Sequence, residues 1–169
     1  MNPARRFLFD ECVGKPVMVR LFAAVKTVAT FEHVCDLYHE GVKDGDWIPQ
    51  AADRGDTVVI TSDAGKNSKD PEKLPILCLK YKLTHVVLSP SLHNKRSHDK
   101  AAAMTLVWDQ IEALQQEERG KRYLLRYRQH KASRLSLELV PSLPKPWELQ
   151  VVKDMDAIQA AEAQEGETT

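Results

Sequence analysis

The sequence predicts a mixed α/β fold in three layers: a central, mainly parallel sheet flanked by helices, followed by a long helix and an antiparallel hairpin. Three observations predict this arrangement. Strand-like and helix-like segments alternate through the first 90 residues, which is typical of parallel strands joined by helical crossovers. Two short runs, TVVIT at 57–61 and THVVL at 84–88, are rich in β-branched residues, as buried strands are. Near the end of the chain, apolar residues alternate with polar ones, which indicates strands with one exposed face.

The elements of the first half follow from local spacing and from turn residues. Pro16 suits the first turn of a helix, and apolar side chains then recur at helical spacing as far as Val25. Trp47 and Ile48 begin another apolar helical face, which Gly55 closes. In chain order we expect strands and helices to alternate over residues 6–9, 16–25, 31–37, 47–52, 57–61, 74–83 and 84–88.

The second half combines one long helix with two period-two segments. Ser97–Glu118 is expected to be helical, with Ser97 as its N-cap and a core face formed by Met104, Val107, Trp108, Ile111 and Leu114. The segments 122–128 and 134–140 alternate apolar and polar residues and are separated by five residues. They predict an antiparallel hairpin with one buried face and one largely basic, exposed face.

The charges are unevenly distributed along the chain. Lysine and arginine number 24, and aspartate and glutamate also number 24, so the formal net charge is zero. From Lys153 to Thr169, however, one lysine faces five acids, whereas seven cations and no acid lie between Arg119 and Leu137. The acidic segment predicts a short helix that gives way to a disordered tail. We therefore expect a catalytic core over 1–92, an extension packed on the same domain over 93–152, and the tail over 153–169.

Composition excludes several classes of protein. The chain is 43% hydrophobic and 28% charged, which is ordinary for a soluble globular protein and unlike a wholly disordered one. No apolar run approaches the roughly 20 residues of a membrane span, and acids at positions 10 and 11 interrupt the N-terminus before a signal peptide could develop. Three widely spaced cysteines suggest neither a zinc site nor a disulfide framework. These features favour a cytoplasmic protein.

Acidic residues follow three predicted strands. Asp10 and Glu11 come directly after the first strand, Asp44 and Asp46 lie in the loop that follows the second, and Asp63 ends the TVVIT strand. Because parallel strands deliver their carboxyl ends to one edge of a sheet, these acids are expected to converge. Carboxylates brought together need a proton or a cation, and an all-oxygen site favours Mg²⁺ or Mn²⁺. The alternative left open is that these acids serve only as turn formers and helix caps.

Other catalytic motifs are absent from the sequence. There is no Gly-rich phosphate loop, no nucleophile elbow and no zinc-protease motif, and the six histidines form no ligand pattern. Ions held by carboxylates can activate water for phosphodiester hydrolysis without any imidazole. The chemistry that the residues favour is therefore metal-dependent hydrolysis.

The progression FLFDEC, KDGDWIPQAADRG and VVITSD over roughly residues 6–90 resembles the PIN-domain superfamily, and most closely its compact PIN-like branch of VapC-type toxin nucleases. The resemblance implies a PIN-like fold and a metal-dependent endoribonuclease. It implies that Asp10, Asp44 and Asp63 are catalytic metal ligands, with Glu11 and Asp46 as supporting metal ligands. A fourth acid, for which Asp70 and Glu72 are candidates, does not align firmly.

The resemblance also implies partners. Such nucleases are commonly the toxin of a toxin–antitoxin module, blocked by a cognate antitoxin, and commonly dimeric. RNA is the expected substrate, and phosphate contacts are expected from the basic hairpin face, formed by Arg122, Arg126, Arg128, Lys131 and Arg134. Two other readings of the sequence are a non-catalytic PIN-like scaffold that binds RNA or protein and, less favoured, a receiver-like signalling domain. The latter lacks a lysine after the THVVL strand, where Ser89 stands instead.

Overall fold

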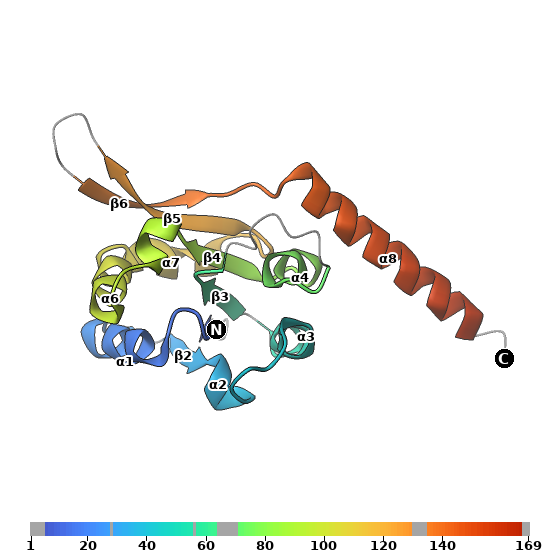
Figure 1. Cartoon of the computed structure of the whole chain (residues 1–169), viewed down its shortest axis with the longest axis horizontal. Coiled ribbons are helices and arrows are strands. Elements are labelled where there is room, and N and C mark those ends of the chain that lie inside the picture. The colour runs from blue at the N-terminus through green and yellow to red at the C-terminus, as the bar shows by residue number, and fades with distance from the viewer. Residues whose placement is uncertain (1–5, 28, 56, 64–70, 130–134, 167–169) are drawn as a thin grey trace.

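The computed structural model centres on one six-stranded sheet, in the order β2-β1-β3-β4-β5-β6 (Figure 1). The structure describes residues 6–27, 29–55, 57–63, 71–129 and 135–166. The strands are β1 (Arg6–Phe9), β2 (Thr30–His33), β3 (Thr57–Thr61), β4 (Thr84–Leu88), β5 (Arg122–Gln129) and β6 (Leu135–Pro141). Strands β1 to β5 pair in parallel, and β5 and β6 form an antiparallel hairpin. The predicted fold class is confirmed.

Helices cover both faces of the sheet. In Figure 1, α1 and α6 lie on one side of the strands, and α3 and α4 lie on the other. The helices are α1 (Lys15–Ala24), α2 (Val34–Leu37), α3 (Asp44–Asp53), α4 (Leu74–Lys80), α5 (Pro90–His93), α6 (Ser97–Leu106), α7 (Trp108–Ala113), the 3-10 turn η1 (Leu114–Gln116) and α8 (Pro146–Gly166). Because both of its faces are covered, β3 and β4 are buried at every position, which explains their continuous apolar character.

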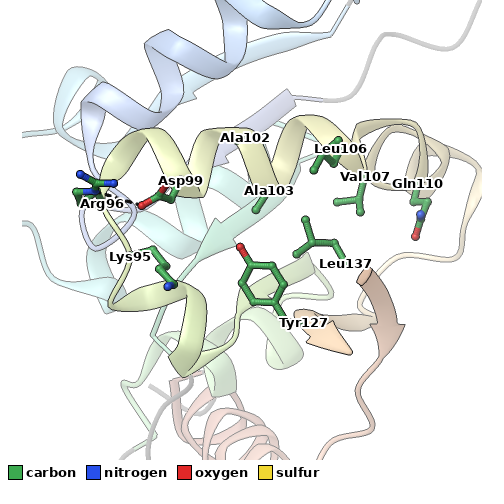
Figure 2. A pocket seen from close by; sticks show the side chains of 10 residues that line it. All are labelled: Lys95, Arg96, Asp99, Ala102, Ala103, Leu106, Val107, Gln110, Tyr127 and Leu137. Atoms are coloured by element: carbon green, nitrogen blue, oxygen red, sulfur yellow. Dashed lines mark hydrogen bonds and ion pairs between the residues drawn. The ribbon is translucent and has the colours of Figure 1, made fainter. Parts of the chain in front are cut away.

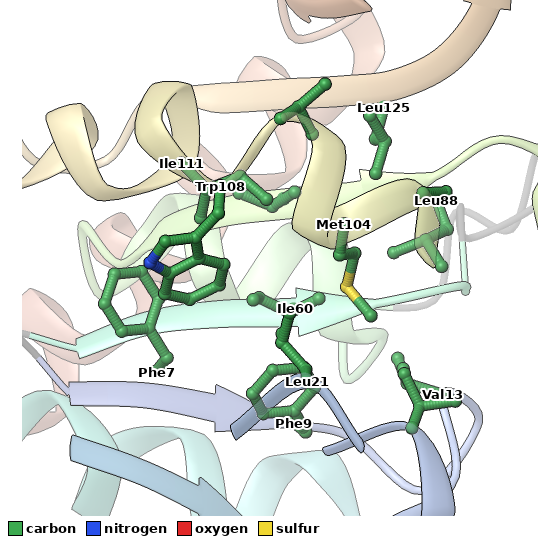
Figure 3. Close-up of a cluster of buried hydrophobic side chains, with 14 of the residues drawn as sticks. Phe7, Phe9, Val13, Leu21, Ile60, Leu88, Met104, Trp108, Ile111 and Leu125 are labelled. Carbon is green, nitrogen blue, oxygen red and sulfur yellow. The ribbon is translucent and has the colours of Figure 1, made fainter. Parts of the chain in front are cut away.

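The larger core lies between the sheet and the layer formed by α1, α6 and α7 (Figure 3). Phe7 packs against Trp108 with ring centroids 4.9 Å apart, and the side chains of Ile60, Leu88 and Met104 are fully buried beside them. The smaller core lies on the opposite face, where Leu8, Trp47, Ile48, Val59, Leu74 and Leu77 join β1 and β3 to α3 and α4. Successive residues of a strand alternate between the two cores, as the pleat requires.

Two elements differ from the sequence prediction. The predicted strand 31–37 ends at His33, whose ring nitrogen Nδ1 accepts a hydrogen bond from the Cys35 amide and so caps the short helix α2. The predicted long helix over 97–118 breaks at Val107, whose backbone leaves the helical conformation. The break turns Trp108 into the core while Leu106 remains 76% exposed.

The C-terminal segment also differs from the prediction. A short helix giving way to a disordered tail was expected over 153–169, whereas α8 continues as one helix to Gly166. Ala, Gln and Glu have high helix propensity, so a segment poor in large apolar residues can still be helical. Residues 167–169 lie outside the described residues. Within the part of the chain that is described, no helix combines the length and the apolar character needed to cross a membrane.

Candidate active site

The acidic residues that follow the first and third strands lie at the point where the strand order of the sheet reverses. After β1 the chain crosses to β2 on one side, and after β3 it crosses to β4 on the other side. Asp10 and Asp63 therefore follow two neighbouring strands at a topological switch point, the usual ligand position in an open α/β sheet. The Asp10 amide extends the pairing by donating to the carbonyl oxygen of Ile60 at 3.0 Å.

Asp44 joins these two acids from the first residue of α3. Its carboxylate is oriented by two donors: the indole N–H of Trp47 at 3.2 Å and the backbone N–H of Leu74 at 3.2 Å. The pKa of Asp44 is raised from its ordinary 3.8 to about 6: burial is the largest cause, the charges of Asp10 and Asp63 add to it, and these two donors oppose it. The three carboxylates therefore share one electrostatic environment, although they come from three elements.

A small hydrogen-bond network holds the carboxylate of Asp10. Its Oδ2 atom accepts from the Cys12 thiol at 2.6 Å and from the Thr61 hydroxyl at 3.0 Å. The Ser62 amide donates to Cys12 Sγ at 3.1 Å, and the Asp63 amide donates to Thr61 Oγ1 at 2.9 Å. The network links the loop after β1 to the end of β3. It also fixes the orientation of one carboxylate relative to the backbone of another.

Cys12 and Thr61 are the site residues that sequence reasoning missed. Burial, followed by the neighbouring Asp10 charge, raises the pKa of the Cys12 thiol. The thiol therefore keeps its proton and donates a hydrogen bond to the carboxylate of Asp10. A signal for Thr61 existed in the strand register: Phe9 pairs with Ile60, which sets Thr61 opposite Asp10. That register is not readable from the sequence without knowing that β1 and β3 are neighbours.

The two supporting acids, Glu11 and Asp46, have different surroundings. Glu11 Oε1 accepts from the Gly41 amide at 2.6 Å and from the Cys35 thiol at 3.2 Å, so it fastens the connection between α2 and α3. Asp46 is exposed. It lies two residues after Asp44 in α3, and two helical residues are turned about 200° from each other. Asp70, a candidate fourth acid, lies outside the described residues, and Glu72 is exposed.

The donor set suits a hard divalent cation. It consists of carboxylate oxygens, and the shared negative charge that raises the pKa of Asp44 is what a bound cation would neutralise. Among the described residues, no group of three or more His, Cys, Asp and Glu side chains is gathered closely enough to hold a metal ion. The chemistry and the shared charge thus fit Mg²⁺ or Mn²⁺, while ligation by all three acids requires side-chain adjustment.

The first residue of the predicted basic hairpin face, Arg122, is largely buried. The expectation that Arg122 is exposed is wrong, because its side chain is 13% exposed and bonds both oxygens of Glu148, at 3.0 and 3.1 Å. Its second guanidinium nitrogen donates to the carbonyl oxygen of Pro75 at 3.1 Å. Arg122 therefore fastens α8 to β5 and α4.

The other basic residues of the hairpin are described only in part. Arg126 is half-exposed and donates to Glu138 across the hairpin at 2.7 Å. The side chain of Arg128 and the residues Lys131 and Arg134 lie outside the described part of the chain. Their assignment to RNA phosphates stays a prediction.

Protein families were compared with the chain, and one family model matches part of it. Residues 5–84 match the family described as PIN-like domain, and the matched segment runs from β1 into the start of β4. It contains Asp10, Asp44 and Asp63, whereas the extension after it is not covered. Comparison with curated proteins and with solved structures gave no significant match. The fold and this family match support the PIN-domain superfamily, whose domains are commonly nucleases, for residues 5–84 of the chain.

Proposed function

We propose that this chain is a metal-dependent endoribonuclease of the PIN-like type. One observation carries the proposal: the topology brings the ends of β1 and β3 and the start of α3 to one region, where the charges of Asp10 and Asp63 add to burial in raising the pKa of Asp44. Groups held close enough to perturb each other's pKa are typical of functional sites.

In this proposal Asp10, Asp44 and Asp63 hold Mg²⁺ or Mn²⁺ through their carboxylate oxygens. The bound ion would lower the pKa of water and neutralise charge on the phosphodiester. The Cys12 thiol and the Thr61 hydroxyl orient Asp10, and the Trp47 indole orients Asp44. These donors keep the acids at the edge of the sheet.

The substrate and the biological role are proposed from the sequence rather than from the geometry of the site. Arg126, Arg128, Lys131 and Arg134 belong to the segment between Arg119 and Leu137, where seven cations occur without an acid, which supports binding of a polyanion such as RNA. The role of toxin in a toxin–antitoxin module, with a cognate antitoxin and a homodimeric state, is proposed from the resemblance to VapC-type nucleases alone. A cytoplasmic location is proposed from the sequence composition.

The test is cleavage of a mixed RNA pool by the purified full-length chain with Mg²⁺, with Mn²⁺ and with EDTA. We expect metal-dependent cleavage that falls at least about a hundredfold in Asp10→Asn and Asp63→Asn, a typical cost of losing a group that stabilises the transition state. Asp53→Asn is the matched control, because Asp53 is exposed at the far end of α3 from Asp44. Cleavage that persists in EDTA, or an Asp63→Asn variant with full activity, would contradict metal-dependent cleavage at the three carboxylates.

The alternative is a non-catalytic PIN-like scaffold, and one contact favours it. The Oδ2 atom of Asp10 already accepts two hydrogen bonds, from Cys12 and Thr61, which compete with a metal ion for that oxygen. A scaffold would bind RNA or protein without turnover at any concentration of Mg²⁺ or Mn²⁺. The same cleavage assay therefore separates the two candidates.

A further inference from the structure

A groove of about 620 Å³ runs between α6–α7 and the hairpin of β5 and β6. Figure 2 shows Tyr127 and Leu137 of the hairpin facing Ala103 and Leu106 of α6 across it. The whole groove is formed by residues 95–137, beyond the segment that matches the PIN-like family. Its walls are about equally polar and apolar: Leu106, Val107 and Leu137 supply apolar side chains, and Gln110 lies among the polar ones.

One end of the groove is basic. Lys95 and Arg96 lie there, together with Asp99, which accepts from Arg96 Nε at 3.4 Å. The Arg96 side chain is 79% exposed, so this ion pair is solvated and contributes little stability. An acid from another molecule can therefore approach Arg96 at little cost. A groove with an apolar strip and a cationic end is complementary to a helix that carries an apolar side chain between acids.

The chain itself carries such a helix. The first turn of α8 is anchored where Glu148 bonds Arg122, and the following turns pack against α4, with Met155 half-buried. Every described side chain from Asp156 to Gln164 is exposed, and Ile158 is 59% exposed. The outer half of α8 is therefore accessible to a partner surface.

The outer half of α8 matches the groove in charge and in length. Asp154 and Glu162 lie four residues before and after Ile158, so both flank it on the same helix face. From Met155 to Gln164 the helix extends about 15 Å, and α6–α7 from Arg96 to Gln110 extends about 20 Å. A helix carrying Ile158 between two acids is thus complementary to a groove with an apolar strip and with Lys95 and Arg96 at its end.

The helix cannot reach its own groove. Figure 1 shows α8 leaving the sheet on the side opposite α6 and α7. Its start is held there by the buried pair of Arg122 and Glu148, whose side chains are 13% and 4% exposed. Only another molecule can bring an α8 helix to the groove.

We propose that the groove between α6–α7 and the hairpin receives the outer half of α8 from a second copy of this chain. Ile158 of one copy lies against Leu106 and Leu137 of the other, and its flanking acids face Lys95 and Arg96. Because groove and helix are different surfaces, each copy can both give and receive a helix. This interface involves none of the acidic site residues, so it stands independently of the nuclease proposal.

The first test is the mass of the full-length chain in solution, measured by sedimentation equilibrium over a range of protein concentrations. We expect the wild-type chain to self-associate, and Leu106→Glu and Ile158→Glu each to weaken association at least about tenfold, which corresponds to about 1.4 kcal/mol. Both residues are exposed, so the variants should keep the wild-type circular dichroism spectrum. Leu143→Glu is the matched control, because Leu143 is 87% exposed and lies outside both surfaces.

The second test mixes the two variants. Leu106→Glu retains an intact α8, and Ile158→Glu retains an intact groove, so the mixture should form a complex that neither variant forms alone. Pull-down of an untagged variant by a tagged one measures this. The proposal is overturned if the wild-type chain is monomeric throughout, including the case where its groove binds RNA or another protein instead. It is also overturned if neither substitution weakens association, or if the mixture associates no better than its components.

Discussion

Replacing Asp10 with asparagine removes the neighbouring charge that acts most strongly on Asp44. After burial, this charge is the largest cause that raises the pKa of Asp44 to about 6. The substitution keeps the shape of the side chain. Cys12 and Thr61 both donate to one carboxylate oxygen of Asp10, and the amide oxygen of asparagine can accept the same two hydrogen bonds. We therefore expect Asp10→Asn to lower the pKa of Asp44 and to stabilise the metal-free protein at neutral pH.

The sign and size of this effect follow from proton binding. Between pH 3.8 and about 6, the folded protein holds a proton on Asp44 that the unfolded chain has lost, so the free energy of unfolding falls as pH rises through this window. At about 1.36 kcal/mol per pH unit, the full loss is at most about 3 kcal/mol. Burial causes the largest part and is unchanged in the variant. Because Asp44 is only half-buried, solvent screens the remaining contribution, which comes from neighbouring charges. Removing the Asp10 charge should therefore raise the free energy of unfolding at neutral pH by about 0.5–1 kcal/mol.

The assay is urea unfolding of wild type and Asp10→Asn in EDTA at pH 4 and at pH 8. We expect equal stability at pH 4 and a more stable variant at pH 8. The exposed control Asp53→Asn should show no such dependence on pH. A variant that is less stable than wild type at pH 8, or a difference that is the same at both pH values, would refute the electrostatic coupling of Asp10 and Asp44.

Three further predictions concern the fold. Arg122→Ala leaves the carboxylate of Glu148 buried without its partner, so we expect a loss of about 3–5 kcal/mol in urea unfolding, much of which the double change Arg122→Met with Glu148→Leu should restore. Leu88→Ala removes a fully buried side chain from the larger core and should cost about 2–5 kcal/mol in the same measurement; a cost below 1 kcal/mol would contradict the described packing. Burial raises the pKa of the Cys78 thiol, so a disulfide reagent at pH 8 should modify Cys78 only after unfolding; rapid modification of the native protein at this residue would show that the smaller core is open.

Patterns that local spacing controls were predictable from the sequence. The strands 57–61 and 84–88 occur at the predicted bounds, because a β-branched run buried on both faces has few alternatives. The break at Val107 was not predictable, since the periodicity of the segment continues through it and the packing of Trp108 against Phe7 decides the local backbone. Tertiary contact overrides helical spacing at that point.

The candidate site divides in the same way. Asp10 and Asp63 could be predicted because they directly follow strands, and the carboxyl ends of parallel strands share an edge. Cys12 and Thr61 could not, because their role depends on the pairing of β1 with β3 across some fifty residues. The role of Arg122 was equally hidden, since its partner Glu148 lies 26 residues further along the chain and alternation alone made it look exposed.

The most direct test of the central claim, that three carboxylates act as one metal centre, is Mn²⁺ binding measured by calorimetry. The wild-type chain is compared with Asp10→Asn, Asp44→Asn, Asp63→Asn and the control Asp53→Asn. We expect each of the three site variants to weaken Mn²⁺ binding at least about tenfold, or about 1.4 kcal/mol, and the control to leave it unchanged. Wild-type affinity in the Asp10→Asn or the Asp63→Asn variant would contradict the claim.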